Sequence, residues 1–242
     1  NKWLEKHEHK KEIRDLWSGF WRSKAKIAYL GDVAQKLKKM KPKIKRKLHW
    51  SVLAGRYYTV CVLRNPVSEN TILLESKHGE DLAGNIFQIL KVLKEEKYKT
   101  YAVYLSMKEE YIPKYKELLL RYNMTHIMFV KTGSKTYKRL LATAKYLATD
   151  TSFPTYYIKR EAQVYLNTWH GTPLKGMGRI VPNREYGLGN VQRNFFIADY
   201  LLYQQEFSRD IFQRDYMLKD IYPGKILTCG YPRNVAFFNT KR

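Results

Sequence analysis

The 242-residue chain has little cysteine, no long hydrophobic run and few acidic residues. Its two cysteines, Cys61 and Cys229, lie far apart in the sequence. That spacing argues against a disulfide scaffold and a cysteine-based zinc cluster, and it suits a reducing compartment. No stretch of eighteen apolar residues occurs, so the sequence predicts no membrane-spanning helix. No signal-peptide pattern follows Asn1, and we expect no such segment in the given chain.

The shortage of acidic residues leaves a large positive charge. Asp and Glu number 22 against 45 Lys and Arg, which gives a formal net charge of +23 at pH 7. Residues 1–50 hold sixteen Lys or Arg and five Asp or Glu, and no acidic residue occurs from Val33 to Ser68. A field of this sign favours polyanionic partners, namely nucleic acid, anionic lipid or a phosphate-rich substrate.

Residues 1–50 form a compositionally separate, basic extension. Ile13, Leu16, Trp17 and Phe20 follow the spacing of one helical face, and the Lys-rich cluster 36–47 comes after them. Aromatic residues on one face together with a basic cluster indicate a helix that lies on an anionic membrane surface. A solvated linker whose tryptophans pack on the following domain fits the same residues, and the sequence leaves both interpretations open.

Residues 51–242 alternate between strand and helix patterns. Short apolar runs predict strands at 58–63, 71–76, 101–105, 127–130, 163–168 and 225–228. Helical spacing predicts helices from Asn85, from Ile112 and from Ser134, the last one continuing to Ala148. Alternation of this kind is typical of an α/β fold with a doubly wound parallel sheet. In such sheets ligands bind beyond the carboxyl ends of the strands.

The segment that follows the predicted strand 163–168 has the composition of a phosphate-binding loop. Lys175 and Arg179 supply cations for phosphate oxygens. Pro173 is typical of the first turn of a helix, whose N-terminus attracts negative charge. Backbone N–H groups can approach an anion closely at three glycines, Gly171, Gly176 and Gly178.

His170 is the side chain of this loop that titrates near neutrality, which makes it the candidate general base for an attacking hydroxyl. A second loop, 229–234, also follows a predicted strand, and there Arg233 can make a bidentate phosphate contact. Structural roles remain open for both residues: a hydrogen-bonded histidine beside Trp169, and a solvated arginine on a turn. Ser76–His78, at a third strand end, can line the same cleft or form an ordinary loop.

The sequence lacks the patterns that mark several other kinds of site. Neither a Walker loop nor a Gly-x-Gly-x-x-Gly segment opening a helix is present, which argues against an ordinary NTPase or dinucleotide enzyme. No His, Asp and Glu cluster has metal-ligand spacing, so we expect no metal and no cofactor.

The combination of segments resembles the CDP-glycerol glycerophosphotransferases of wall teichoic acid synthesis. The most specific part is the string Trp169-His-Gly-Thr-Pro173, followed by Lys175 and Gly178. Supporting segments occur in the same order as in the family, and the resemblance covers residues 71–234. They are Leu74–Ser76, Gly79, Asn85, Ser134, Leu141–Leu147, Pro154, Asp199–Leu202 and Gly230–Asn234.

The resemblance implies a GT-B-like enzyme with two Rossmann-like domains, of which this chain holds the N-terminal, acceptor-side half. Such enzymes move glycerol phosphate from CDP-glycerol to a hydroxyl of an undecaprenyl-type lipid-linked acceptor and release CMP. They work as peripheral proteins at the cytoplasmic face of the cell membrane. The resemblance assigns the base to His170 and contacts with the substrate to Trp169, Gly171, Thr172, Pro173, Lys175 and Arg233.

Two departures from the family pattern affect these expectations. Val235 stands where the family usually has Asp after the Gly-Tyr-Pro-Arg-Asn segment. The second, nucleotide-binding domain has no counterpart here, so we expect these 242 residues alone to bind CDP-glycerol weakly and turn over little. The alternatives are a CDP-ribitol or capsule-polymer phosphotransferase of the same family, and a non-catalytic basic module that binds anionic lipid or nucleic acid.

Overall fold

The computed structural model describes residues 42–82, 84–182 and 188–238. The chain divides into two compact units, residues 1–53 and residues 54–242. Of the predicted basic extension, residues 42–50 are helical and belong to α3 (Pro42–Arg64). The amphipathic stretch 13–20 and the first half of the cluster, residues 36–41, lie outside the described residues.

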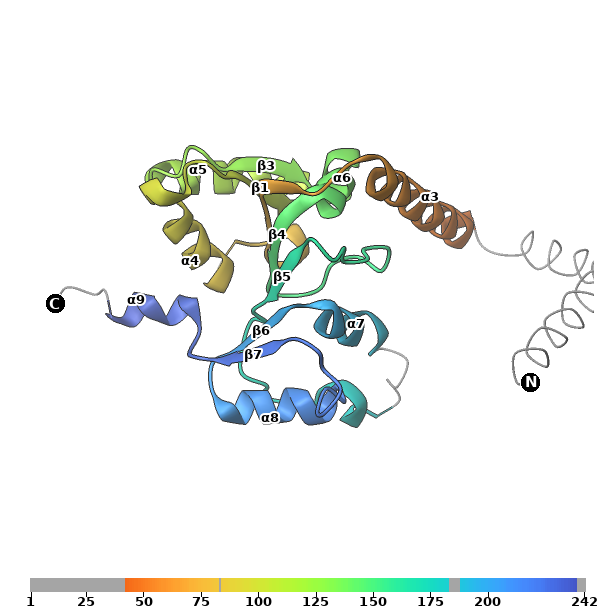
Figure 1. Cartoon of the computed structure of the whole chain (residues 1–242), viewed down its shortest axis with the longest axis vertical. Coiled ribbons are helices and arrows are strands. Elements are labelled where there is room, and N and C mark those ends of the chain that lie inside the picture. The colour runs from red at the N-terminus through yellow and green to blue at the C-terminus, as the bar shows by residue number, and fades with distance from the viewer. Residues whose placement is uncertain (1–41, 83, 183–187, 239–242) are drawn as a thin grey trace, which may run out of the picture. The chain divides into compact units, whose positions relative to one another are not determined.

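The second unit is built on a seven-stranded sheet whose neighbouring strands are all parallel (Figure 1). The strand order is β3-β2-β1-β4-β5-β6-β7. The predicted doubly wound, Rossmann-like sheet is therefore confirmed, and the strand order reverses direction between β1 and β4. The strands are β1 (Ser68–Glu75), β2 (Ala102–Met107), β3 (Met128–Lys131), β4 (Ala144–Thr149), β5 (Val164–Asn167), β6 (Tyr200–Tyr203) and β7 (Lys225–Thr228).

Helices pack on both faces of the sheet because successive strand residues point to opposite sides. Ile72 and Leu74 of β1 pack with α4 (Gly84–Leu93) and α5 (Ile112–Arg121). Leu73 faces the other side, where the core includes residues from α3, α6 (Lys135–Thr143), α7 (Gly189–Ile197) and α8 (Glu206–Asp215). Five 3₁₀ turns and a short helix complete the described elements: η1 (Lys77–Gly79), η2 (Glu96–Tyr98), η3 (Glu109–Tyr111), η4 (Gly178–Ile180), η6 (Pro232–Asn234) and α9 (Val235–Phe238).

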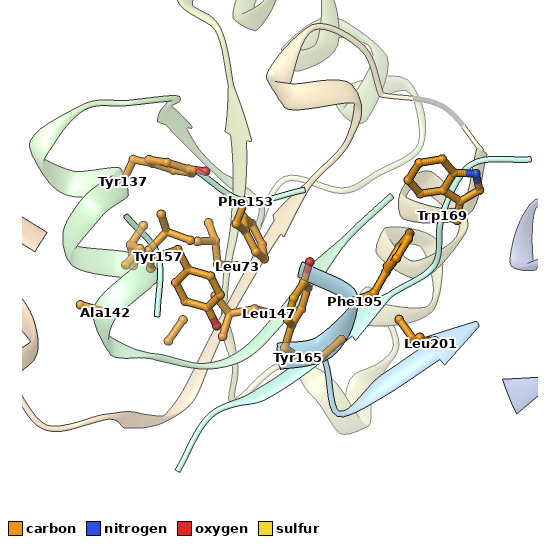
Figure 2. Packing of buried hydrophobic residues seen from close by; sticks show 14 of the residues in the cluster. Leu73, Tyr137, Ala142, Leu147, Phe153, Tyr157, Tyr165, Trp169, Phe195 and Leu201 are labelled. Carbon is orange, nitrogen blue, oxygen red and sulfur yellow. The ribbon is translucent and has the colours of Figure 1, made fainter. Parts of the chain in front are cut away.

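The core on the Leu73 side is rich in aromatic rings (Figure 2). Phe153 lies 5.2 Å from the ring centroids of both Tyr157 and Tyr165. Trp169 packs edge-on against Phe195 at 5.5 Å, and Figure 2 shows both residues beyond Tyr165 in the same cluster. Edge-on and tilted aromatic pairs add about 0.5–1.5 kcal/mol each to the burial of their area. The residue before His170 is thus anchored in the main core.

The α4 side of the sheet carries a cavity of about 540 Å³. Its walls come from β4 to β7 and from α4, through residues such as Tyr146, Leu166, Tyr200 and Leu227. The lining is almost entirely apolar and includes none of the predicted site residues. This cavity therefore lies on the face of the sheet and is separate from the predicted active-site residues.

The predicted strand at 58–63 is wrong, since these residues belong to α3. The β-branched residues Thr59 and Val60 favour a strand locally. Tyr58 and Cys61, three residues apart, are both buried, whereas Val60 is 41% exposed. Burial on one helical face has therefore outweighed local strand preference.

The predicted helix from Ser134 to Ala148 is correct only in its first half. The Ser134 side chain accepts a hydrogen bond from the Tyr137 backbone N–H at 3.1 Å and caps α6, as expected. The chain then becomes extended at Ala144 and forms β4. Ala144 and Ala148 are four residues apart, a spacing that places two residues on one face of a strand as well as of a helix. The pattern could not separate the two, and β6 was also missed.

Candidate active site

Polar loops gather at the carboxyl ends of β1, β4 and β5, on both sides of the point where the strand order reverses. Ser76 follows β1, Asp150 follows β4, and His170 comes three residues after β5. Ligands of parallel sheets bind at these strand ends, so the three loops mark the region where a ligand is expected.

Asp150 joins the loops after β1 and β5, and the sequence analysis did not single it out. Its carboxylate accepts hydrogen bonds from the Ser76 hydroxyl at 2.7 Å and from the Lys77 backbone N–H at 2.8 Å. Its backbone carbonyl lies 2.8 Å from Nδ1 of His170. The residue is 2% exposed. If β4 had been recognised in the sequence, Asp150 would have stood out as an acidic residue directly after a strand.

His170 is half-buried, and its contacts define which ring nitrogen carries the proton. A carbonyl oxygen only accepts hydrogen bonds, so Nδ1 of the neutral ring is the donor to Asp150. Nε2 is then the unprotonated, basic nitrogen. The ring also stacks on Trp169, with centroids 4.3 Å apart and planes 28° apart. The imidazole is fixed in both position and tautomer.

The backbone of Trp169 adopts the left-handed conformation, with φ of 49°. A bulky residue in this region costs about 1–3 kcal/mol and needs support from its surroundings. Its N–H donates to the Asn167 side chain at 3.0 Å, and its carbonyl accepts from Thr168 at 2.9 Å and from Asn85 at 3.1 Å. These bonds hold the turn that directs His170 away from the aromatic core.

Arg233 lies against the His170 loop, so it is not the solvated arginine that the sequence also allowed. Its Nη1 donates to the His170 carbonyl at 2.9 Å, and its guanidinium lies 5.2 Å from the Tyr231 ring centroid. Its backbone N–H donates to Asn85 at 3.3 Å. The loops after β5 and β7 and the start of α4 therefore meet at one place, and a guanidinium has further N–H groups for an anion there.

The other predicted substrate-binding residues occupy varied positions in the loop. Gly171 is close to Arg233: a Cβ built on it would lie 4.0 Å from Nη2. The Thr172 hydroxyl accepts a hydrogen bond from Gln204. Pro173 is buried, and Lys175 is exposed further along the loop.

The helix expected to begin in this loop is wrong. No helix begins at Pro173; the chain stays irregular until the 3₁₀ turn η4, so no helix dipole adds charge there. Gly178 serves packing, because a Cβ on it would lie 2.2 Å from the Asp215 carbonyl oxygen. The anion-binding groups left in the loop are therefore backbone N–H groups and side chains.

The loop after β1 approaches the same region. Lys77, His78 and Gly79 have φ values of 47°, 53° and 78°, a left-handed run that costs energy at the two non-glycine residues. Gly79 is needed there, because a Cβ would lie 2.3 Å from Thr132 Oγ1. Nδ1 of His78 lies 3.5 Å from the Thr151 hydroxyl. Ser76–His78 thus lies beside the segment after β4 that also contacts His170.

A second buried carboxyl group, Glu75, lies beneath the site at the end of β1. It is 2% exposed, and its Oε2 has no hydrogen-bond partner among the described residues. The pKa of Glu75 is raised to about 7, chiefly by burial; the Tyr137 and Ser106 hydroxyls oppose this shift, and the nearby Asp150 carboxylate adds to it. Glu75 therefore keeps its proton in the folded protein up to about neutral pH.

Replacing Glu75 by Gln is expected to change how stability depends on pH. Because the folded-state pKa lies above the unfolded one, the wild-type protein gains relative stability below about pH 4.5 and loses it as the pH rises through 7. The difference in unfolding free energy between wild type and Glu75→Gln should change by about 3 kcal/mol across this window. Denaturant unfolding at pH 4.5 and 8 measures it. Glu117→Gln, at an exposed position of α5, is the control, and a constant difference for Glu75→Gln would contradict the assignment.

Within the described residues, no group of three or more His, Cys, Asp or Glu side chains is placed to hold a metal ion. A search of the same residues for helices long and apolar enough to span a bilayer found none.

The fold and the site define a Rossmann-like α/β domain with an imidazole and a guanidinium at the carboxyl edge of its sheet. The family model described as CDP-glycerol:poly(glycerophosphate) glycerophosphotransferase matches residues 57–242. The chain therefore belongs to this glycerophosphotransferase family.

Individual relatives agree with this assignment. A teichoic acid poly(glycerol phosphate) polymerase of Bacillus subtilis strain 168 is 26% identical over 84% of this chain and 27% of its own length. A teichoic acid glycerol-phosphate transferase of Staphylococcus aureus strain NCTC 8325 is 28% identical over 81% of this chain and 48% of its own. The solved structure of the wall teichoic acid polymerase TagF superposes with a TM-score of 0.62 at 24% identity, covering 81% of this chain and 48% of that one. The chain thus spans about half or less of the proteins that it resembles.

Proposed function

We propose that this chain contributes the acceptor-side domain of an enzyme that moves glycerol phosphate from CDP-glycerol to a hydroxyl of a lipid-linked acceptor in teichoic acid synthesis. The family assignment supports the reaction class, and the names of the two bacterial relatives support the polymer. A TagF variant soaked with CDPG has the same fold, with a TM-score of 0.61.

One observation carries the proposal: the bond from His170 Nδ1 to the Asp150 carbonyl leaves Nε2 as the free base at the edge of the sheet. A histidine that acts as a general base needs one unprotonated nitrogen within hydrogen-bond reach of the substrate hydroxyl. The stacking of Trp169 and the hydrogen bond from Arg233 to the His170 carbonyl keep the residue in that position.

In the proposed reaction, Nε2 of His170 takes the proton of the acceptor hydroxyl as its oxygen attacks the β-phosphorus of CDP-glycerol. The new oxygen–phosphorus bond forms while the bond to the bridging pyrophosphate oxygen breaks, and CMP leaves. Arg233, Lys175 and backbone N–H groups of Gly171 and Thr172 stabilise the charge on the phosphates. The imidazolium then returns its proton to solvent.

The direct test is release of CMP by the full-length protein. CDP-glycerol with a lipid-linked glycerol phosphate acceptor should give CMP and an acceptor longer by one or more glycerol phosphate units. CDP-ribitol in place of CDP-glycerol, with the same acceptor, separates the two donors. Absence of CMP release together with tight, salt-dependent binding of nucleic acid would contradict the proposal and favour a binding module.

We further propose that the basic extension holds the enzyme at the cytoplasmic membrane surface. Each Lys or Arg near an anionic bilayer contributes about 1 kcal/mol, so the cluster 36–47 can supply most of the binding. Replacing its Lys and Arg residues by Gln should abolish sedimentation with vesicles that contain phosphatidylglycerol. The wild-type protein should sediment with these and not with purely zwitterionic vesicles. Equal sedimentation of both proteins would contradict this role.

A further inference from the structure

Asp150 belongs to both sides of the site. Its side chain contacts the loop after β1, and its main chain contacts the loop after β5. We propose that Asp150 is the positioning residue of His170: its carboxylate is tied to Ser76 and Lys77 so that its carbonyl holds Nδ1–H and keeps Nε2 free. The role in catalysis rests on the function proposed above.

The backbone carbonyls of residues 149–151 all accept hydrogen bonds from β5 or from the loop that follows it. The Thr149 carbonyl accepts from the Thr168 N–H at 3.0 Å, and the Thr151 carbonyl accepts from the Asn167 side chain at 2.8 Å. With the Asp150 carbonyl, three successive carbonyls therefore hold one side of the turn. Asn85 and Arg233 also hold the turn, by donating to the Trp169 and His170 carbonyls.

The carboxylate of Asp150 supplies the restraint from the β1 side. Its two bonds, at 2.7 Å and 2.8 Å, go to a hydroxyl and a backbone N–H of one short loop. The contact from His78 to the Thr151 hydroxyl, at 3.5 Å, is at the outer limit of a hydrogen bond. The Asp150 carboxylate is thus the stronger of these two side-chain links between the loop after β1 and the segment after β4.

The left-handed loop after β1 needs this restraint as well. Lys77 and His78 both have positive φ, and the bond from the Lys77 N–H to the carboxylate stabilises that conformation. One side chain therefore couples the strained loop after β1 to the tautomer of the imidazole in the loop after β5. Catalysis is sensitive to such coupling, because a displacement of about 1 Å at a reacting group can cost 10²-fold in rate.

Two substitutions at Asp150 separate its hydrogen bonds from its charge. Asn can accept from the Lys77 N–H through its oxygen and donate to the Ser76 hydroxyl through its amide, so Asp150→Asn keeps the link. Asp150→Ala removes it. In the full-length enzyme we expect kcat to fall about 10- to 100-fold for Asp150→Ala and only a few-fold for Asp150→Asn, with the KM for CDP-glycerol changed little in both.

The tautomer itself gives a readout that does not need activity. Nitrogen NMR of the full-length protein with ¹⁵N-labelled histidine reports which ring nitrogen is protonated, and His170→Gln identifies the signal. We expect wild type and Asp150→Asn to show His170 protonated at Nδ1, and Asp150→Ala to show a mixture of tautomers. Ser76→Ala, which removes one of the two bonds, should give a smaller change and serves if Asp150→Ala fails to fold.

Asp199 provides the matched control. Its half-buried carboxylate also ties two segments, accepting from the Tyr165 N–H at 2.7 Å and from Lys159 at 2.8 Å, but Asp199 precedes β6 and lies at the opposite ends of the strands. Asp199→Ala should lower stability without changing the His170 tautomer. Unchanged tautomers in both Asp150→Ala and Ser76→Ala would overturn the proposal. A shifted tautomer in a protein that releases no CMP would leave the positioning role standing and overturn the proposed function instead.

Discussion

His170→Ala in the full-length enzyme should lower kcat by about 10²–10⁴-fold, the range that a positioned general base contributes. The loss should fall on kcat more than on the KM for CDP-glycerol, because the base acts when the acceptor hydroxyl attacks. The structure gives the reason: Nδ1 is committed to the Asp150 carbonyl, and only Nε2 is free to accept a proton.

His126 supplies the control for this substitution. It is an exposed histidine in the turn before β3, so His126→Ala should keep wild-type turnover. Release of CMP under single-turnover conditions separates chemistry from product release. Turnover of His170→Ala within a few-fold of wild type would show that another group takes the proton.

Arg233→Ala is expected to have the second-largest effect, about 10²–10³-fold on kcat/KM. The Nη1 of Arg233 holds the His170 carbonyl, and in the proposed reaction its remaining N–H groups bind the pyrophosphate. Lys keeps the charge but not the planar fork, so Arg233→Lys should recover only part of the activity.

The matched control is Arg121→Ala, which removes an exposed arginine that pairs with Glu117 on α5. Such surface pairs contribute little, and this variant should behave as wild type. Steady-state kinetics over a range of CDP-glycerol concentrations measure the effect. If Arg233→Ala lost no more than Arg121→Ala, Arg233 would be a structural residue of the loop and not a donor contact.

The sheet itself was largely predictable because its strands are short apolar runs between clear helix signals. The runs at 71–76, 101–105 and 163–168 became β1, β2 and β5, and Ser134 capped α6 as expected. The errors came from residues whose local preference is ambiguous or is outweighed by packing. Thr59 and Val60 favour a strand but lie on the outer side of α3, and Ala144 and Ala148 fit either period.

The site was predicted in part. The rule for carboxyl ends brought His170, Arg233 and Ser76 to one edge of the sheet, and the structure places them there. Asp150 was missed because the strand before it was taken for a helix. Its link to His170 runs through a backbone carbonyl, which no residue pattern can reveal. The helix expected at Pro173 does not form, because a proline with the φ of a first helical turn also fits an irregular loop.

The most direct test of the central claim is the position of the donor in a crystal structure of the full-length protein with CDP-glycerol. We expect the pyrophosphate to lie between His170 and Arg233. Nε2 should be about 5–6 Å from the β-phosphorus, which leaves room for one attacking oxygen between them. A donor bound elsewhere, with the His170 ring remote from both phosphates, would contradict it.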